Sequence, residues 1–142
     1  MPARAVLFDF NGTLSDDEPI PPAGSCIVVL ATDLPLAPAQ LERVARRAGL
    51  GLARTGSVAH HGSGEIFVAF ATSDARSTPD DQLDDLFEAA VDATEEAVLN
   101  ALWAAPDVEG REGRLQRGVP HDEVLKLLRQ HNALAPGSTG RS

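Results

Sequence analysis

The sequence of 142 residues contains one cysteine, few basic residues and no long hydrophobic run. Because Cys26 is alone it cannot form an internal disulfide, and its position inside an apolar segment indicates a buried thiol in a reducing compartment. No apolar stretch approaches the roughly 20 residues of a membrane-spanning helix. Asp9 stands where a signal peptide would be apolar. We therefore expect a cytoplasmic protein that has no membrane partner.

Basic side chains are scarce relative to acidic ones. The chain has 12 Lys and Arg against 21 Asp and Glu, which gives a net charge of −9 at pH 7. This charge argues against nucleic acid or an anionic membrane surface as a partner. Adjacent His60 and His61 have no cysteine or further histidine at ligand spacing, so we expect neither a metal nor a cofactor. The length suits one domain with a core.

The first uninterrupted apolar run covers residues 26–31, between Gly24-Ser25 and Thr32-Asp33. Such a run indicates a strand buried on both faces, because a half-buried strand would alternate polar and apolar residues. Ser25 then stands at the start of a central strand. From this position alone, Ser25 is either a nucleophile held by a rigid element or a turn residue that opens the strand.

A second polar turn leads into a second apolar run. Residues 62–65 read Gly-Ser-Gly-Glu, and residues 66–71 are apolar throughout. Between the two runs, apolar residues recur at helical spacing after Pro38, which predicts a helix. Two such strands indicate a sheet between other layers, and hence an α/β fold. On residue type alone, the turn is a flexible tight turn and Glu65 a carboxylate at the sheet edge.

The second half of the sequence is predicted to be mainly helical. Pro79 precedes an acidic first turn and the longest apolar stripe, which predicts a helix that packs across the sheet with Trp103 in the core at its end. Residues 107–118 form a glycine-rich, charged loop, and a shorter helix starts at Pro120. Residues 133–142 have the composition of a disordered tail.

The leader, residues 1–24, contains an apolar run at residues 5–8, which is followed by Asp9 and then by Phe-Asn-Gly-Thr. This resembles the first motif of the haloacid dehalogenase phosphatases, which implies that Asp9 matches the aspartate that attacks phosphorus. The family's second aspartate is replaced by Asn11, which cannot transfer a proton. A charged, proline-rich link at residues 15–24 follows where that family has a helix. We interpret the leader as a fragment joined to another sequence, with a phosphatase as a distant alternative.

The order of the remaining motifs is more specific. Gly-Ser precedes an apolar strand ending in Ala-Thr-Asp, a helix closes in Gly-Leu-Ala-Arg-Thr-Gly, and Gly-Ser-Gly-Glu-Ile-Phe opens the second strand. From Gly24 to about Asn132 this resembles the β subunit of the L-aminopeptidase/D-esterase and β-peptidyl aminopeptidase family, whose members cleave themselves to expose an N-terminal serine. The resemblance implies a peptidase domain at residues 25–132 that forms half of an αββα sandwich, with a much longer upstream α segment missing.

The resemblance implies that the Gly24–Ser25 bond is the self-cleavage site, that Ser25 is the nucleophile, and that Ser63 and Glu65 assist it. Chemistry is compatible with these roles, because an N-terminal serine carries its own α-amine, whose pKa is about 7.7 to 8.0, near working pH. Ser63 and Glu65 are separated by one residue, so in an extended segment both side chains point to the same side. They would form a polar relay that orients Ser25 or its amine.

The function implied by the resemblance is that of a serine aminopeptidase acting on small peptides, amides or esters. The missing α segment implies that an α-subunit-like chain, or a second copy of this chain as an oligomer, covers the open sheet face. The competing hypothesis is a non-catalytic remnant or oligomerising module of the same fold. An uncleaved chain that is inert toward aminoacyl substrates would favour the second hypothesis.

Overall fold

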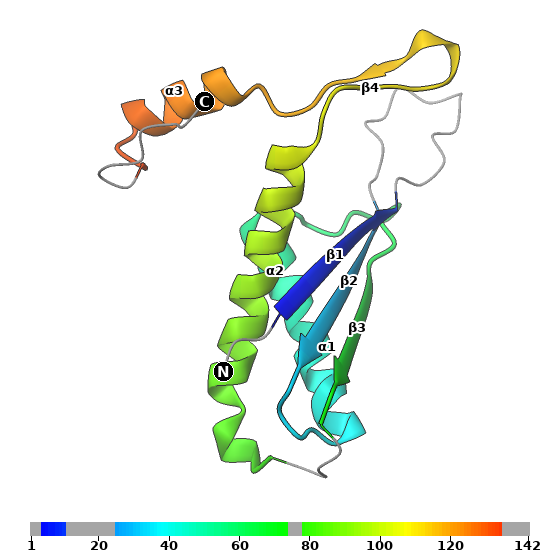
Figure 1. The fold of residues 1–142 in the computed structure, drawn as a ribbon, viewed down its shortest axis with the longest axis vertical. Coiled ribbons are helices and arrows are strands. Elements are labelled where there is room, and N and C mark those ends of the chain that lie inside the picture. The colour runs from blue at the N-terminus through cyan, green and yellow to red at the C-terminus, as the bar shows by residue number, and fades with distance from the viewer. Residues whose placement is uncertain (1–3, 11–24, 74–77, 135–142) are drawn as a thin grey trace. The chain divides into compact units, whose positions relative to one another are not determined.

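The computed structural model describes residues 4–10, 25–73 and 78–134 (Figure 1). The chain divides into two compact units, residues 1–100 and residues 101–142. The predicted proline-rich link at residues 15–24, with Gly24, lies outside the described residues, as do residues 135–142 of the predicted tail.

The N-terminal unit is built on a sheet of three strands in the order β1-β2-β3. The strands are β1 (Arg4–Phe10), β2 (Ser25–Thr32) and β3 (Ile66–Ala71). Strand β2 pairs antiparallel with β1 and parallel with β3. The two apolar runs of the sequence therefore form neighbouring strands, and the apolar run of the leader forms the third.

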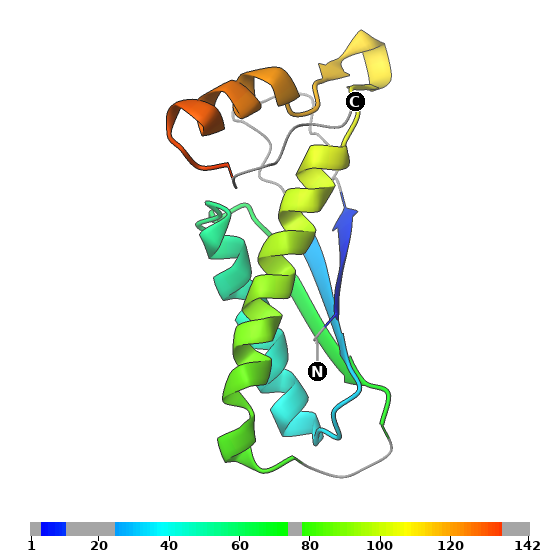
Figure 2. The ribbon, with the colours of Figure 1, turned by 60° about the vertical axis from the view of Figure 1, so that its left-hand side comes forward.

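Two long helices cover one face of this sheet (Figures 1 and 2). Helix α1 (Pro38–Arg54) connects β2 to β3, and α2 (Asp84–Ala104) follows a short 3-10 turn at Asp80–Gln82. Their apolar stripes pack against the inward side chains of β2. The main core is formed by Val28, Leu30, Leu36, Val44, Ala48, Leu52, Leu83, Leu86, Phe87, Ala90 and Val98.

The described residues leave the opposite face of the sheet open. Ile66, Val68 and Phe70 of β3 are 55%, 44% and 45% exposed, although all three are large and apolar. On β2, Ile27 and Val29 are only half-buried, whereas Val28 and Leu30 between and beyond them are buried. From the apolar runs we expected both faces of the sheet to be covered. In the structure, helices cover one face. An apolar run shows that a strand is suited to two-sided burial but not whether its own chain supplies both layers.

Helix α1 meets α2 at Gly51. A Cβ atom at this position would lie 2.6 Å from both the Thr94 Cβ and the Val91 carbonyl oxygen of α2. Glycine is therefore required here by the close approach of the two helices. One turn further on, Arg54 Nη1 lies 2.5 Å from an Asp92 carboxylate oxygen and 3.2 Å from one of Glu95.

The start of α1 is tied to the segment before α2 by Gln40. Its Oε1 accepts a hydrogen bond from the Ala37 N–H at 3.0 Å, and its Nε2 donates to the Thr78 carbonyl at 2.6 Å and to Asp80 Oδ1 at 2.8 Å. Arg43 adds an ion pair to the other oxygen of Asp80 at 3.0 Å. The two helix starts are thus joined by hydrogen bonds around a buried amide.

The C-terminal unit contains a short hairpin of β4 (Val108–Glu109) and β5 (Leu115–Gln116), then helix α3 (His121–Gln130). The hairpin lies in the segment predicted to be a loop. No residue from 101 to 134 is fully buried. Trp103 is 40% exposed and stacks on the His121 ring at 4.1 Å, so its predicted core position is wrong. The tryptophan packs against a surface histidine because none of the described residues of this unit encloses it.

Among the described helices, none combines the length and the apolar character needed to cross a membrane.

Candidate active site

The starts of β2 and β3 lie at the same edge of the sheet. The two strands are parallel, and Ile27 pairs with Ile66. Ser25 is the first residue of β2, and the segment Ser63, Gly64 and Glu65 directly precedes β3. Parallel pairing therefore brings the two polar turns of the sequence together.

Strand alternation decides the face on which Ser25 lies. Val28 and Leu30 are buried under the helices and Cys26 packs against the same core. Successive side chains on a strand point to opposite faces, so Ser25 belongs to the open face together with Ile27 and Val29. The hydroxyl thus lies on the side of the sheet that the described residues leave without a layer of helices.

A direct hydrogen bond joins the two strand starts. The Gly64 backbone N–H donates to Ser25 Oγ at 3.1 Å. A Cβ atom at Gly64 would lie 3.2 Å from the same oxygen, closer than an ordinary van der Waals contact. Sequence reasoning treated Gly64 only as part of a turn. The sequence feature that could have pointed to Gly64 is its position, as a residue without a side chain between the two predicted site residues Ser63 and Glu65.

Ser63 and Glu65 form a second polar contact at this edge. The Ser63 hydroxyl donates to Glu65 Oε1, so the two side chains do lie on the same side of the segment. The Ser63 N–H donates to the His60 carbonyl oxygen at 2.7 Å and closes the turn. Both residues are half-buried. The edge therefore combines a hydroxyl on β2, a backbone donor and a hydroxyl–carboxylate pair.

Metal ligands do not gather in the part of the chain that the structure describes: no group of three or more His, Cys, Asp or Glu side chains could hold an ion there. His60 and His61 are exposed residues of the turn before Ser63.

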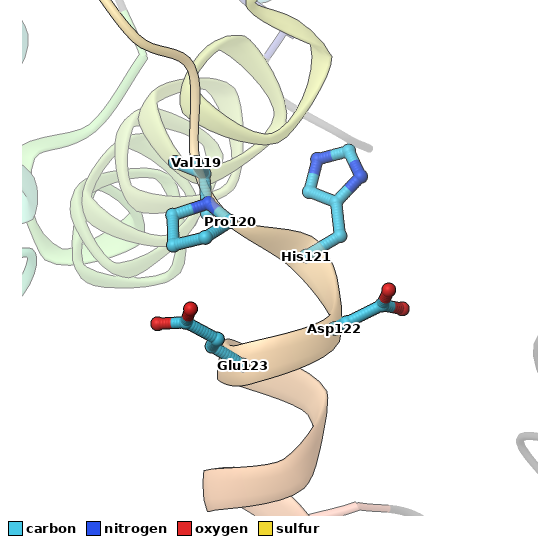
Figure 3. Close-up of a pocket in the computed structure, with 5 residues that line it drawn as sticks. All are labelled: Val119, Pro120, His121, Asp122 and Glu123. Carbon is cyan, nitrogen blue, oxygen red and sulfur yellow. The ribbon is translucent and has the colours of Figure 1, made fainter.

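A hollow at the start of α3 is lined by the consecutive residues 119–123. Figure 3 shows that the side chains of Asp122 and Glu123 point to opposite sides of the helix, while the His121 ring stands apart from both. His121 Nε2 is 2.8 Å from the Trp103 carbonyl oxygen, which accounts for its orientation. These side chains do not converge, so we assign no chemistry to this hollow.

Comparison with known proteins supports the assignment of the fold. The structure resembles the L-aminopeptidase D-Ala-esterase/amidase of Ochrobactrum anthropi, a variant of the Ntn-hydrolase fold, with a TM-score of 0.73 and 43% identity over 78% of this chain and 35% of that one. It also resembles a β-aminopeptidase of Burkholderia sp., with a TM-score of 0.69 and 38% identity over 78% of this chain and 36% of that one.

Relatives of known activity are similar in sequence. The chain is 42% identical to the β-peptidyl aminopeptidase BapA of Sphingosinicella microcystinivorans over 127 residues, which cover 81% of this chain and 32% of the relative. BapA of Sphingosinicella xenopeptidilytica is 39% identical over 74% of this chain and 29% of its own length. The chain thus spans about a third of the length of these relatives.

The profile of peptidase family S58 matches residues 5–116. The match covers most of the chain, includes β1, β2, β3, α1 and α2, and contains both strand starts of the candidate site. The match begins at residue 5 and so includes the apolar run before Asp9. The chain belongs to peptidase family S58.

Proposed function

We propose that this chain is a serine aminopeptidase of the β-subunit type, which cleaves its own Gly24–Ser25 bond and uses the new N-terminal serine as its nucleophile. The observation that carries the proposal is the position of Ser25 at the start of a central strand, hydrogen-bonded to the Gly64 N–H and at the same sheet edge as the Ser63–Glu65 pair. A nucleophile held by a strand start is fixed in direction, which favours attack along one line.

Self-cleavage follows from ordinary acyl-transfer chemistry. Ser25 Oγ loses its proton and attacks the carbonyl carbon of Gly24. The carbon–nitrogen bond to Ser25 breaks, the nitrogen takes up the proton as an amine, and an ester joins Gly24 to Oγ. Water then hydrolyses this ester, which restores the Ser25 hydroxyl and leaves its α-amine free.

The same oxygen would act in turnover. The α-amine of Ser25 accepts the hydroxyl proton as Oγ attacks the substrate carbonyl, and the leaving amine or alcohol takes a proton as its bond breaks. Water hydrolyses the acyl ester and releases the product acid. In this scheme the Ser63–Glu65 pair orients Ser25 or its amine and stabilises the charge that forms there.

The substrates we propose are small peptides, amides or esters with a free amino group. The relatives support this class, since they are β-peptidyl aminopeptidases and an L-aminopeptidase D-Ala-esterase/amidase. An α-subunit-like chain or a second copy of this chain would cover the open face. Ser25 lies on that face, so the covering layer would form one wall of the substrate pocket. Loss of one oxyanion donor from such a layer typically costs about 10²–10³ in rate.

The alternative is a non-catalytic remnant or oligomerising module. The open apolar face favours it as well, because Ile66, Val68 and Phe70 present a surface suited to association with or without catalysis. Intact-mass measurement and an assay with aminoacyl p-nitroanilides separate the two. A new N-terminus at Ser25 supports the enzyme, whereas an intact chain without amidase activity supports the module.

A further inference from the structure

We propose that Gly64 is a positioning residue for Ser25: its backbone N–H holds Ser25 Oγ in place, and its missing side chain leaves the space that this oxygen occupies. The inference rests on the proposed role of Ser25 and adds a residue to the set of Ser25, Ser63 and Glu65. It concerns the main chain between the two assisting residues and not their side chains.

The donor comes from the backbone and is therefore fixed. The Gly64 N–H points at Ser25 Oγ at 3.1 Å. A serine side chain otherwise samples three staggered rotamers, and a hydrogen bond to one of them favours that rotamer. Because the donor belongs to a segment that leads directly into β3, it cannot turn away as a side-chain donor could.

The Ser63–Gly64 peptide is itself held from both sides. Upstream, the Ser63 N–H donates to the His60 carbonyl oxygen at 2.7 Å. Around Gly64, the Ser63 hydroxyl is hydrogen-bonded to Glu65. The contact between Ser63 and Glu65 thus has a second effect, which is to fix the direction of the Gly64 N–H toward Ser25.

Space at Gly64 is limited by Ser25 itself. A Cβ atom would lie 3.2 Å from Ser25 Oγ and 3.8 Å from Ser25 Cβ. Gly64 is not among the glycines with positive φ, Gly56 and Gly113, so its backbone conformation is open to other residues. An alanine at this position would therefore keep the N–H and the backbone but push the Ser25 oxygen aside.

The hydrogen bond would act at the two steps in which Ser25 Oγ gains negative charge. The first is the loss of its proton during attack. The second is hydrolysis of the ester, when the bond between the acyl carbon and Oγ breaks and its electron pair returns to the oxygen. A fixed N–H facing the oxygen stabilises that charge without reorganisation.

The first test compares Gly64→Ala with Gly62→Ala, an exposed glycine of the same turn. Where the wild-type chain cleaves itself, Gly64→Ala should slow cleavage roughly 10- to 100-fold, since displacement of a reacting atom by about 1 Å costs up to ~10²-fold. Its melting temperature should match that of Gly62→Ala, and any turnover should fall in kcat with little change in KM. Equal cleavage rates in the two variants would overturn the inference and leave the proposed function standing.

The second test does not depend on activity. If the wild-type chain stays intact, the proposed function fails. Amide hydrogen exchange at Gly64 then tests the inference, because the wild-type chain and its variants have the same length. Ser25→Ala should speed exchange at Gly64, while Ser57→Ala, whose hydroxyl faces the Ala59 N–H, should leave it unchanged. If Gly64→Ala fails to fold, the same hydrogen-exchange comparison tests the inference in its place. Unchanged exchange at Gly64 in Ser25→Ala would overturn the inference.

Discussion

The Gly64 N–H donates a hydrogen bond of 3.1 Å to Ser25 Oγ. Ser25 lies two residues before Ile27 of β2, and Gly64 lies two residues before Ile66 of β3, which is the parallel partner of Ile27. The strand register therefore determines the site. A slip of one residue would move Ser25 to the face covered by the helices and away from the Gly64 N–H. The apolar residues of the two strands thus fix the register, and the register places Ser25 next to Gly64.

The pair of Ser63 and Glu65 should be required for self-cleavage. Glu65→Gln keeps the size of the side chain but removes the charge that the Ser63 hydroxyl faces. We expect cleavage after Gly24 to slow by about 10²-fold or more in Glu65→Gln and in Ser63→Ala, since positioned acid–base groups contribute ~10²–10⁴. Time courses of intact mass provide the measurement. Rates equal to that of the Ser57→Ala control would remove the pair from the mechanism.

Two glycines of α1 should respond to alanine in opposite directions. Gly51→Ala would bring its Cβ to 2.6 Å from backbone and side-chain atoms of α2, and we expect a loss of about 1–3 kcal/mol in the free energy of unfolding. Gly49→Ala meets only the Phe67 ring at 3.5 Å and should gain about 0.5–1 kcal/mol from the higher helix propensity of alanine. Urea denaturation of both variants checks this. A Gly51→Ala variant that is as stable as the wild type would show that the helices are not packed at Gly51 as described.

The contribution of Asp80 to stability should be lost at acidic pH. The hydrogen bond from Gln40 lowers the pKa of Asp80, and desolvation opposes this while Arg43 adds to it. Since the pKa is lower in the folded state, the stabilisation is complete above the unfolded pKa of about 4 and is lost as the pH falls through the folded value. The difference in melting temperature between the wild type and Asp80→Asn should therefore shrink below about pH 4. A difference that is constant across this range would contradict the assignment.

The open sheet face should mediate association. Phe70 of the edge strand β3 is 45% exposed on this face, so Phe70→Glu should leave the fold intact while making the face unsuited to an apolar partner. If a second copy covers the face, sedimentation should show wild-type assemblies larger than the 14.9 kDa chain and a shift toward that mass in Phe70→Glu. Val58→Glu, at an exposed loop residue, serves as the control. A wild-type chain that is monomeric at all concentrations would exclude the second copy and leave the α-subunit-like partner.

Apolar periodicity was sufficient to predict most elements of the N-terminal unit. The unbroken run at 66–71 forms β3 over the same residues, and Pro38 begins α1 because a proline nitrogen needs no hydrogen-bond partner in the first turn. The hairpin of β4 and β5 was missed because strands of two residues are too short to show a period. Trp103 was misplaced because an aromatic residue at a helix end has the same pattern whether or not another layer covers it.

The candidate site was predictable only in part. Ser25, Ser63 and Glu65 were predicted from the order of the motifs, and the parallel pairing of the strands brings their segments together at one edge. Gly64 was not identified, because its contact with Ser25 is made by a backbone N–H that leaves no side-chain signal. The open face was expected only from the family resemblance, because apolar runs alone carry no information about which chain supplies the second layer.

The most direct test of the account is the intact mass and N-terminal sequence of the purified 142-residue chain beside its Ser25→Ala variant. The account predicts that the wild-type chain separates after Gly24 and yields a fragment that begins at Ser25, while Ser25→Ala keeps all 142 residues. A folded wild-type chain that remains uncleaved, with the same mass as expected from its sequence, would contradict the claim that Ser25 is a self-activating nucleophile.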